Sequence, residues 1–555
     1  MDHQGKSQSL QSLEKVEDKK SFQEKVAECG RLMIQASVEP ASLLLMTSVL
    51  MSYLTFQNVM VENICRVRLK LDHDVCKEII KANETYKNDT EQINTILAET
   101  KIYRSILDHS FPVIYVIFMG PWSDHYGRKL SLIIPFVGYI VQSIAYLICA
   151  QFFIDSADPF TMNILTSLPR SVTGGEPAYA MAAYAYISDI TTHKSRTIRS
   201  GLLSAAYTIG VPCGFSLGGL LADENVSNTA SFAISIAFVT TGLLILLFRA
   251  DNLTKADRLA LERVEKGDRD DDTGGKNAEE EDILGPNPTW RDVLNPKNTL
   301  FKVVSLPFRK RENSGRIKFI LLLVAFLCAA APIHGEFGVI FMYVSSKLSW
   351  DASRYGYFSS VNTLIGVAGV VLSMGLFSKW MKLSDPLVGF IAGISQMAGS
   401  LVYAFICTGC GYMIYLASTI DMMNGTMIVI SRSMLSKIVD DNEIGKLFSL
   451  IAILETLTPL AMDPTYSKLF HFTLKNGYFL GAFFLLSAAL TVPPQIIYLW
   501  FIIKNRTSKK NPIEENCDQP SLPPNVQTSS GAEPTKKKNG IISDGGHTNL
   551  GFHTD

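Results

Sequence analysis

Seven ionisable side chains stand in stretches of sequence that are otherwise strongly apolar. They are Arg170, Glu176, His334, Glu336, Asp421, Arg432 and Glu455. An ionised group surrounded by hydrocarbon costs at least about 3 kcal/mol, so such groups usually face a partner or a water-filled path. The pattern therefore predicts a polar route through a structure that is embedded in a membrane.

The two embedded arginines are candidates for binding an anion. A guanidinium group holds a carboxylate or phosphate-like group through two parallel hydrogen bonds, and we assign this role to Arg170 and Arg432. Arg170 and Glu176 lie six residues apart, which is roughly 240° around a helix, so they do not pair along one face. The alternative for Arg170 is a side chain that extends to the lipid headgroups. Glu176, Asp421 and Glu455 are candidates for binding protons or solute.

His334 and Glu336 form a candidate proton-handling pair. Pro332 precedes them and Gly335 separates them, which predicts a break in the helix that exposes both side chains to a cavity. Histidine titrates nearest to neutral pH, and burial favours the neutral form of a carboxyl group. The alternative is a hydrogen-bonded core histidine beside a glutamate near the membrane surface.

Composition places these residues in a chain that crosses a membrane many times. The chain has 555 residues, 47% of them hydrophobic, and a formal net charge of −1. Its charges concentrate in a few blocks and leave apolar runs of about 20 residues, which is enough to cross a bilayer. Twelve such runs are predicted, at 38–59, 106–122, 130–153, 161–188, 198–222, 229–250, 317–344, 355–380, 386–408, 412–434, 446–472 and 477–503. This pattern excludes a soluble globular protein.

The charged blocks divide the chain into five parts. Lysine and arginine concentrate in alternate short loops, which predicts that both termini lie in the cytosol. The parts are a tail at 1–37, a six-helix bundle at 38–250, a cytosolic loop at 251–316, a second six-helix bundle at 317–503 and a disordered tail at 504–555. The first part contains no apolar stretch, so no cleavable signal peptide is predicted.

Residues 60–105 are predicted to form a large loop on the outer side of the membrane. Three glycosylation sequons lie on the predicted outer side, at Asn83, Asn88 and Asn225. Cys65 and Cys76 fall in the same loop, where an oxidising environment permits a disulfide bond. Cys407 and Cys410 lie in another outer loop, and we expect them to form a small disulfide or to remain free thiols.

The loop between the second and third predicted spans carries a polar motif of fixed spacing, Gly-Pro-Trp-Ser-Asp-His-Tyr-Gly-Arg-Lys at residues 120–129. Gly127 permits a tight turn, and Asp124 can pair with Arg128. Such a charge cluster can latch two halves of a protein in one state. The candidate latch comprises Gly120, Asp124, Gly127, Arg128 and Lys129. The motif resembles that of the major facilitator superfamily, which implies twelve helices in two pseudo-symmetric six-helix bundles and alternating access to a solute.

The fifth predicted span is rich in small residues. Its candidate packing and gating residues are Gly210, Pro212, Gly214, Gly218 and Gly219. Small residues let helices approach closely in lipid, and proline weakens the local ladder of hydrogen bonds. This pattern resembles the superfamily's fifth-span glycine motif, which implies a position at the interface between the two halves.

A closer resemblance is carried by the fourth, tenth and eleventh spans. The segments 195–199, 432–439 and 443–449 resemble the proton-coupled folate transporter branch, solute carrier family 46. The branch includes a folate carrier, a thymic relative and a lysosomal-type member, and the resemblance implies proton-driven symport into the cytosol. Arg432 falls on the tenth-span arginine of the branch. Ser204 stands about where the folate carrier has a glutamate, which favours the thymic and lysosomal-type members.

We therefore expect an all-α integral membrane transporter that carries a small organic anion or conjugate into the cytosol together with a proton. Its partners are then the lipid bilayer, the solute and protons, at the plasma membrane or the lysosomal membrane. No motif for an enzyme, a cofactor, a metal site or nucleic-acid binding is visible in the sequence. The alternatives are a receptor or sensor that keeps the fold without transport, and an interaction protein that binds partners through its outer loop.

Overall fold

The structure is a computed structural model that describes residues 38–81, 83–191, 193–224, 226–250, 305–309, 315–439 and 444–514. The described residues up to Ile503 belong to one compact unit, and Lys504 to Glu514 belong to a second. The predicted tail 1–37, nearly all of the predicted loop 251–316, residues 515–555 and the sequon residue Asn225 lie outside the described residues. The same holds for the side chains of residues 120, 121 and 124–126.

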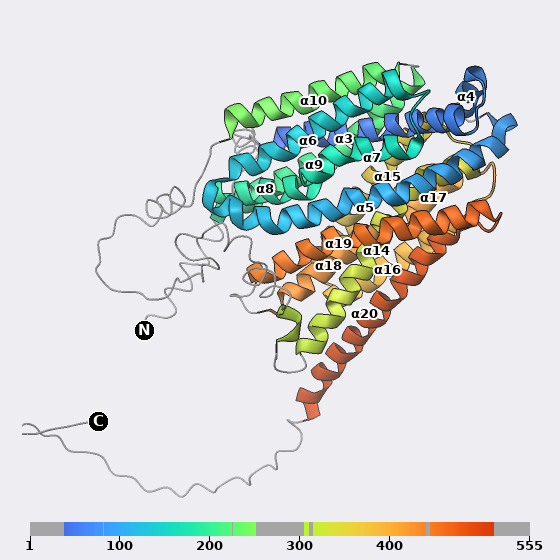
Figure 1. The fold of residues 1–555 in the computed structure, drawn as a ribbon. Helices are drawn as coiled ribbons and strands as arrows, with labels where there is room; N and C mark the ends of the chain where they lie inside the picture. Colours follow the sequence, from blue (N-terminus) through green and yellow to red (C-terminus); the bar gives the residue numbers. More distant parts are fainter. Residues whose placement is uncertain are drawn as a thin grey trace, which may run out of the picture. The chain divides into compact units, whose positions relative to one another are not determined.

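The described residues fold into helices that fall into two groups. The first group, called the N-half, contains α3 (Val38–Asn63), the short α4 (His73–Ile80), α5 (Lys87–Tyr126), α6 (Arg128–Ile148), α7 (Pro159–Val172), α8 (Gly175–Ile190), α9 (His193–Asp223) and α10 (Asn228–Arg249). The second, called the C-half, contains α14 (Gly315–Leu348), α15 (Ala352–Leu372), α16 (Asp385–Ala404), α17 (Tyr412–Ile420), α18 (Asn424–Ser436), α19 (Ile444–Lys475) and α20 (Ala482–Glu514). Figure 1 shows the N-half in blue to green and the C-half in yellow-green to red.

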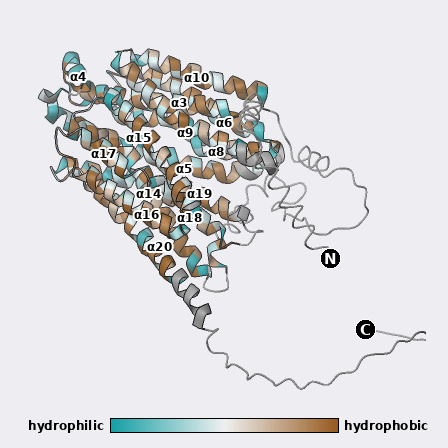
Figure 2. Ribbon diagram, turned by 180° about the vertical axis from the view of Figure 1, so that it is seen from behind, coloured by the Kyte–Doolittle hydropathy of each residue, from teal (hydrophilic) through white to brown (hydrophobic). Residues whose placement is uncertain are grey.

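Ten of the described helical segments are long and apolar enough to cross a membrane. The other two predicted spans are α5, which carries charged residues in its middle, and the fourth span, which is divided into α7 and α8. Hydrophobic residues run along the helices, whereas the short α4 carries hydrophilic and hydrophobic residues in equal number (Figure 2). Large apolar side chains such as Leu165, Phe248 and Leu364 are exposed on the helices, as a lipid-facing surface requires. The helices are therefore consistent with the predicted twelve spans.

Two spans contain a break in the middle. The fourth breaks between α7 and α8, where Gly174 has φ 84° and Gly175 has φ 53°, a conformation that glycine adopts without steric cost. The tenth breaks between α17 and α18, where Asp421 caps the end of α17. Each break lies within a predicted membrane span. Ionisable side chains therefore lie close to backbone groups that are outside the regular helical hydrogen-bond pattern.

The predicted break in the seventh span is wrong. Helix α14 is continuous through Pro332 and Gly335. A Cβ at Gly335 would collide with the ring of Tyr466 on α19, so this glycine serves close packing of two helices. Neighbouring helices can support the backbone around an intramembrane proline, which explains why the Pro-Gly spacing did not interrupt α14.

Helix α5 begins much earlier than the sequence predicted. The predicted second span started at residue 106, whereas α5 starts at Lys87 and contains 40 residues. At about 1.5 Å per residue it is roughly 60 Å long, which is about twice the hydrocarbon thickness of a bilayer. Much of the predicted loop 60–105 is therefore helical, because it also contains α4 and a π-helical turn at Ile64–Arg68.

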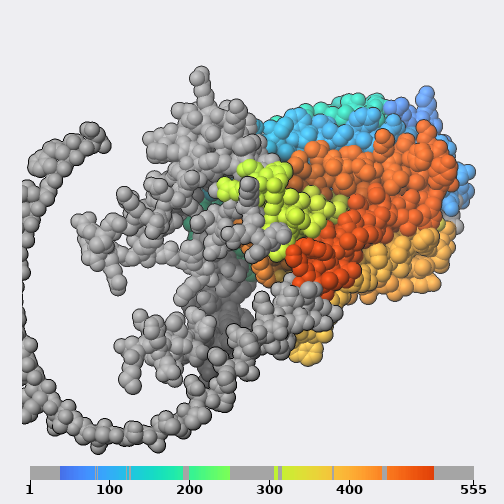
Figure 3. Space-filling model, turned by 90° about the horizontal axis from the view of Figure 1, so that it is seen from below, coloured from blue at the N-terminus to red at the C-terminus, as the bar shows by residue number. Residues whose placement is uncertain are grey.

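The two halves contact each other chiefly through two pairs of helices, α5 with α19 and α9 with α15. Helix α5 of the N-half packs along α19 and more lightly along α14, and α9 packs along α15. In Figure 3 the C-half helices cover the lower part of the visible face and blue N-half helices lie along its upper edge. The surface between the halves, called the seam, is thus lined chiefly by α5, α9, α14, α15 and α19.

Both disulfide bonds lie at the same end of the helices. Cys65 is bonded to Cys76 after α3, and Cys407 is bonded to Cys410 between α16 and α17. We call this the disulfide end. The turn between α5 and α6 lies at the opposite end, because α5 starts at the disulfide end and runs away from it.

The last helix is longer than expected. The sequence predicted disorder from residue 504, but α20 continues to Glu514. Its final residues, Lys504 to Glu514, belong to the second compact unit.

Candidate functional site

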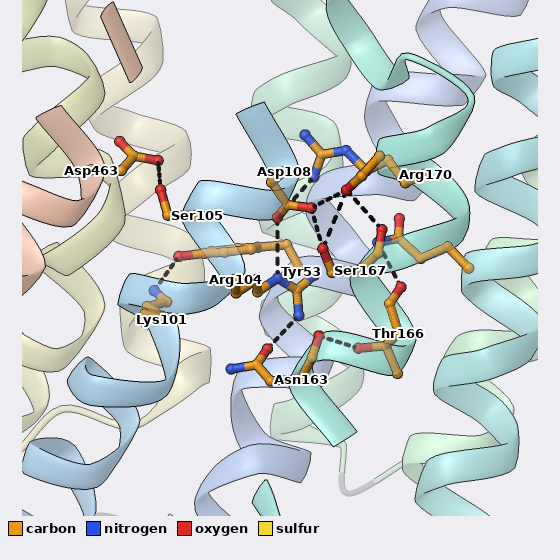
Figure 4. A network of polar contacts seen from close by, with 12 residues as sticks. Tyr53, Lys101, Arg104, Ser105, Asp108, Asn163, Thr166, Ser167, Arg170 and Asp463 are labelled. Atoms are coloured by element: carbon orange, nitrogen blue, oxygen red, sulfur yellow. Dashed lines mark hydrogen bonds and ion pairs between the residues drawn. The ribbon is translucent and has the colours of Figure 1, made fainter. Parts of the chain in front are cut away.

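Helix α5 presents two polar faces in the same few turns. Lys101, Ser105 and His109 recur every four residues, which places them on one face of a helix, and this face meets the C-half. Arg104 and Asp108 are also four residues apart and point to α6 and α7 within the N-half. Figure 4 shows Lys101, Arg104, Ser105 and Asp108 with several of their partners. One helix therefore connects a charge cluster inside the N-half with a row of contacts across the seam.

Arg104 lies at the centre of the cluster inside the N-half. Its Nη1 donates to Asn163 Oδ1 over 2.8 Å and its Nη2 donates to Tyr146 OH over 2.5 Å. Its Nε lies 3.2 Å from Asp108 Oδ2. The guanidinium also stacks over the ring of Phe56, with 5.0 Å to the centroid. All three nitrogen atoms and the flat face of the guanidinium make contacts, and these contacts fix its orientation.

Asp108 joins two arginines and two serines. Its Oδ1 accepts hydrogen bonds from Ser167 over 2.6 Å and from Ser171 over 3.0 Å, and its Oδ2 lies 3.9 Å from Arg170 Nη1. Arg104 and Arg170 contribute two positive charges and Asp108 contributes one negative charge, so these three side chains carry a net charge of about +1. Arg170 is 21% exposed, so part of its guanidinium remains accessible to an anion.

The contacts across the seam centre on Asp463 of α19. Its Oδ2 lies 3.0 Å from His109 Nε2 and accepts a hydrogen bond from Ser105 over 3.2 Å. Lys101 donates to the backbone oxygen of Gly338 on α14 over 2.6 Å. When His109 is protonated, His109 and Asp463 form an ion pair between the two halves. Protonation of one histidine can therefore change how strongly the halves are held together.

Further contacts across the seam lie toward the disulfide end. Asn94 Nδ2 donates to Ser346 Oγ over 2.8 Å, and His471 Nδ1 lies 3.0 Å from the backbone oxygen of Thr95. On the other side of the seam, a hydrogen bond of 2.9 Å joins Ser216 on α9 to Ser360 on α15. These residues lie in the part of each helix that is nearer the disulfide end, so the halves are held together there.

The fifth-span glycines serve two different interfaces. A Cβ at Gly210, Gly214 or Gly218 would approach atoms of α3, which belongs to the same half. Gly219 instead faces α15, where its Cα would lie 3.0 Å from a Cβ at Gly356. Only this last glycine of the motif lies at the seam. The expectation that the whole motif lies between the halves is therefore wrong for the other three glycines, and Pro212 accepts a hydrogen bond from Ser360 across the seam over 3.0 Å.

His334 and Glu336 do not form a pair. Residues two apart on a continuous helix point about 200° away from each other, and α14 is continuous at this point. His334 faces the seam, where Asp463 and His109 interact with it electrostatically. Glu336 faces the interior of the C-half, next to Ser487 and within electrostatic range of Asp421. The predicted pair is therefore two separate groups.

Arg432 and Glu455 form an ion pair between α18 and α19. Their side chains are 39% and 37% exposed, about twice as much as His109 and Asp463 at 17% and 20%. The Arg432 guanidinium lies 5.7 Å from the centroid of the Phe326 ring, and its Nε is buried without a hydrogen-bond partner. Glu176 is exposed in the first turn of α8. The structure thus places these candidates apart from the His109–Asp463 contact.

The candidate latch is tied to the rest of the N-half. Gly127 has φ 104° and turns the chain between α5 and α6. Arg128 donates from Nε to Asp189 on α8 over 2.8 Å and from Nη1 to Ser123 over 2.7 Å, and Lys129 donates to the backbone oxygen of Leu247 over 2.8 Å. Asp189 is thus a partner of Arg128 that the sequence did not indicate. The side chain of Asp124, the predicted partner, lies outside the described side chains, and so does position 120.

The central charged residues Lys101, Arg104, Asp108, His109 and Asp463 were missed by the sequence analysis. The predicted second span began at residue 106 and left the first two in a loop, although buried Ile93 and Leu97 continue the helical period before it. The four-residue spacing of polar residues on α5 was a usable signal. Asp463 precedes Pro464 within an apolar run of α19 and could have been found by the criterion that selected Glu455.

A helical bundle in two halves, with ionisable side chains along the surface between them, is typical of a membrane transporter. The Major Facilitator Superfamily model matches residues 111–462. The chain belongs to this superfamily, whose members are transporters and not enzymes.

Curated relatives are solute carrier 46 proteins. The chain is 24% identical over 448 residues to a probable peptidoglycan muropeptide transporter of Drosophila melanogaster, with 79% of this chain and 80% of that protein covered. It is 26% identical over 378 residues to the human lysosomal proton-coupled steroid conjugate and bile acid symporter, covering 67% and 73%. It is 22% identical over 415 residues to the rat proton-coupled folate transporter, covering 73% and 79%.

Solved structures confirm the fold. The human organic anion transporter MFSD10 matches with a TM-score of 0.52 and 13% identity, covering 84% of this chain and 99% of that chain. The peptide transporter PepTSo matches with a TM-score of 0.53 and 10% identity, covering 84% and 98%. The protein is therefore a multi-pass membrane transporter with the major facilitator fold.

Proposed function

We propose that this transporter moves a small organic anion or conjugate into the cytosol together with a proton, by alternating access. The observation that carries the proposal is the contact across the seam between His109 Nε2 and Asp463 Oδ2, which lie 3.0 Å apart. On α5, His109 lies within one helical turn of Asp108, which belongs to the cluster with Arg104 and Arg170. A histidine, whose ring can accept and release a proton, is thus built into the surface that must open and close.

The coupling follows from electrostatics. A proton on His109 attracts Asp463, which stabilises the state that is closed at the disulfide end. When the opposite end opens to the cytosol, the higher pH removes the proton and the attraction falls. The halves then separate more readily at the disulfide end, and the cycle restarts. His334, which interacts with both groups, provides a second position for the proton at the seam.

The arginines provide the anion site. Arg104 is held by four contacts, whereas the Arg170 guanidinium lies 3.9 Å from Asp108 and beside the aromatic ring of Tyr139. The net charge of about +1 on Arg104, Asp108 and Arg170 is neutralised by one monoanionic group, such as a carboxylate or sulfate. Arg432 would meet the anion on its way to the opposite end, where its side chain is 39% exposed.

The names of the relatives fit an anion or conjugate, since they mention muropeptides, steroid conjugates, bile acids and folate. Among these we favour conjugates or muropeptides over folate. Ser204 stands about where the folate carrier has a glutamate, and its hydroxyl forms a hydrogen bond of 2.8 Å with Tyr184. That position therefore offers no carboxylate.

We further propose that the disulfide end faces the extracellular space or the lysosomal lumen, with both termini in the cytosol. Two disulfide bonds lie at this end, and disulfides persist in oxidising compartments. The sequon residues Asn83 and Asn88 are exposed in the same region. Glycosidase treatment should sharpen and shift the band of the wild type. The variant that lacks all three predicted outer sequons, Asn83→Gln/Asn88→Gln/Asn225→Gln, should show no shift, and no shift in the wild type would contradict this assignment.

Uptake measurements test the function. Cells with confirmed surface protein receive a labelled steroid sulfate, a muropeptide or folate at about pH 5.5 and about pH 7.5, which bracket the titration of histidine. We expect faster uptake of at least one conjugate at the acidic pH, and loss of that pH dependence in His109→Gln. Binding of a solute without flux at either pH would instead support a receptor that keeps the transporter fold.

A further inference from the structure

Glu176 is a carboxylate inside a predicted membrane span, and the proposed function leaves it unused. It lies in the first turn of α8 and is exposed. Among the described residues, none forms a hydrogen bond or an ion pair with it. An ionised group at such a depth is costly unless water or a partner surrounds it. The exposure of Glu176 therefore indicates that it borders a space which water or a solute can enter.

The face of α8 that carries Glu176 points toward the C-half. Helix α8 packs against α5, α6 and α9, which all belong to the N-half. Glu176 and Tyr184 lie eight residues apart, so they share one broad face of the helix. Tyr184 is 40% exposed and interacts electrostatically with Arg432 of the C-half, which is itself 39% exposed. A solute between the halves therefore meets this face of α8.

The break between α7 and α8 brings Glu176 close to Arg170. Residues six apart on a continuous helix point in different directions, but here the chain turns at Gly174 and Gly175, which have φ 84° and φ 53°. The Arg170 side chain packs against this turn, since its Nε would lie 3.3 Å from a Cβ at Gly175. Glu176 follows Gly175 directly, and the charges of Glu176 and Arg170 interact electrostatically. Two opposite charges thus lie together at the break.

Arg170 and Glu176 do not pair with each other. Their side chains are described, and no ion pair joins them. The Arg170 guanidinium lies 3.9 Å from Asp108 and 5.7 Å from the centroid of the Tyr139 ring, and Figure 4 shows Arg170 beside Asp108. These contacts hold the guanidinium away from Glu176. Arg170 is 21% exposed and Glu176 is exposed as well, so each charge is accessible to a solute group of opposite sign.

The charge balance at the break favours a solute that carries both signs. Arg104, Asp108 and Arg170 together carry about +1, and an ionised Glu176 lowers the sum to about zero. A solute with an anionic group alone would bring the sum to about −1, in surroundings where charges interact more strongly than in water. A solute with an ammonium group next to its anionic group adds no net charge.

We propose that Arg170 and Glu176 bind the zwitterionic end of a conjugate. The guanidinium binds the carboxylate of that end, and the Glu176 carboxylate binds its ammonium group. The pair thereby selects conjugates that end in a free amino acid. A conjugate without an amine leaves Glu176 beside an uncompensated anion, which is a repulsive element against it. This inference rests on the proposed function, because it adds a cation-binding partner to the same anion site.

Two muropeptides that differ in one group test the pair. The first is a muramyl tripeptide that ends in diaminopimelate, whose side chain carries an ammonium group next to a carboxylate. In the second, this amine is acetylated. Their Kd values for the purified protein in lipid nanodiscs are measured at neutral pH, without any transport assay. We expect the wild type to bind the free amine about tenfold more tightly, as for one charge-assisted contact.

Two results with the wild type would overturn the inference. One is an equal Kd for the two forms, and the other is no binding of either form. In both cases, acid-stimulated uptake of a steroid sulfate by cells would leave the proposed function standing. The failure of the inference can therefore be told from the failure of the function.

Variants assign the preference to these residues. Glu176→Gln should bind both forms with the same Kd, because a neutral amide does not attract an ammonium group. Arg170→Gln should weaken the binding of both forms, since both keep the carboxylate. The matched control is Asp385→Asn, which removes a carboxylate that pairs with Lys437 in the C-half and should keep the preference of the wild type. If Glu176→Gln melts like the wild type and still prefers the free amine, Glu176 does not bind the ammonium group and the inference fails.

Discussion

At the scale of residues, the structure separates the side chains that are fixed within one half from the side chains whose contact across the seam can change. Arg104, Asp108 and Asn163 form a network with fixed geometry inside the N-half, whereas His109 and Asp463 meet across the seam. In the first group, the hydrogen-bond donors of Arg104 bind acceptor oxygens of Asn163 and Asp108. The second contains a histidine, which carries a positive charge only when it binds a proton. We therefore assign pH sensitivity to the seam and solute affinity to the cluster.

The pH sensitivity can be tested with a double-mutant cycle. Each of His109→Gln and Asp463→Asn removes one charge of the pair, and we expect each to slow acid-driven uptake by about tenfold, within the usual range of coupling energies. The double variant should be no slower than either single variant, because all three lose the same contact. Initial uptake rates at acidic and neutral pH measure these effects.

His471→Gln is the matched control for this cycle. His471 also crosses the seam, but it contacts the backbone oxygen of Thr95 and not a carboxylate. It should therefore keep the acid stimulation of the wild type. Independent losses, in which the double variant is about a hundredfold slower, would show that His109 and Asp463 do not act as a pair.

The cluster makes a prediction about stability. Asp108→Asn leaves Arg104 and Arg170 without their counter-charge, in a site where the Arg104 and Asp108 side chains are 13% and 11% exposed. Loss of one member of a buried ion pair costs about 3 kcal/mol. The unfolding midpoint in nanodiscs should fall accordingly. Glu78→Gln, which affects an exposed contact with Lys81, should change the midpoint little, and equal effects of both variants would contradict a structural role for Asp108.

At the scale of elements, the sequence predicted the membrane spans well and their interruptions poorly. Apolar runs located the spans because hydrophobicity depends on composition alone. Pro332 and Gly335 did not break α14, because Tyr466 fills the space at Gly335. Gly174 and Gly175 did break the fourth span. Whether a glycine serves a turn or a close contact depends on neighbouring helices that a single sequence does not display.

The same limit applies to the candidate site. Arg170, His334 and Arg432 could be selected as embedded charges, and the structure places all three beside ionisable or aromatic partners. Their partners could not be predicted, since Asp108 and Asp463 come from helices distant in sequence. The predicted boundary at residue 106 also cut through the charged turns of α5.

The seam between α9 and α15 leads to a prediction about closure. A Cβ at Gly356 would lie 2.7 Å from the backbone oxygen of Phe215 and 3.0 Å from the Cα of Gly219, so Gly356→Val should prevent the halves from closing at the disulfide end. Transport should fall strongly, and a cysteine placed in this part of the seam should become accessible to a water-soluble maleimide. Gly366→Val on the same helix meets nothing within 4 Å and should behave as the wild type. Equal accessibility in both variants would contradict this account of closure.

At the scale of the whole molecule, transport requires the seam to open at each end in turn. The contacts at the disulfide end hold the described structure closed there. One of them joins Ser216 Oγ and Ser360 Oγ, which lie 2.9 Å apart across the seam. A disulfide between cysteines at these two positions should lock the halves, in a background where the nearby free Cys213 is replaced by serine. Oxidation should stop uptake, and a reductant should restore it. Uptake that continues at full rate in the cross-linked protein would contradict opening at this end.

The most direct test of the account measures proton and anion movement together in proteoliposomes. Purified protein is reconstituted with a pH-sensitive dye inside the vesicles, and the anion that cells take up best is added outside at acidic pH. The account predicts that anion entry acidifies the interior, that the two fluxes keep a constant ratio, and that a protonophore stops anion accumulation. Anion accumulation that persists without a pH gradient, and without acidification, would contradict proton-coupled symport.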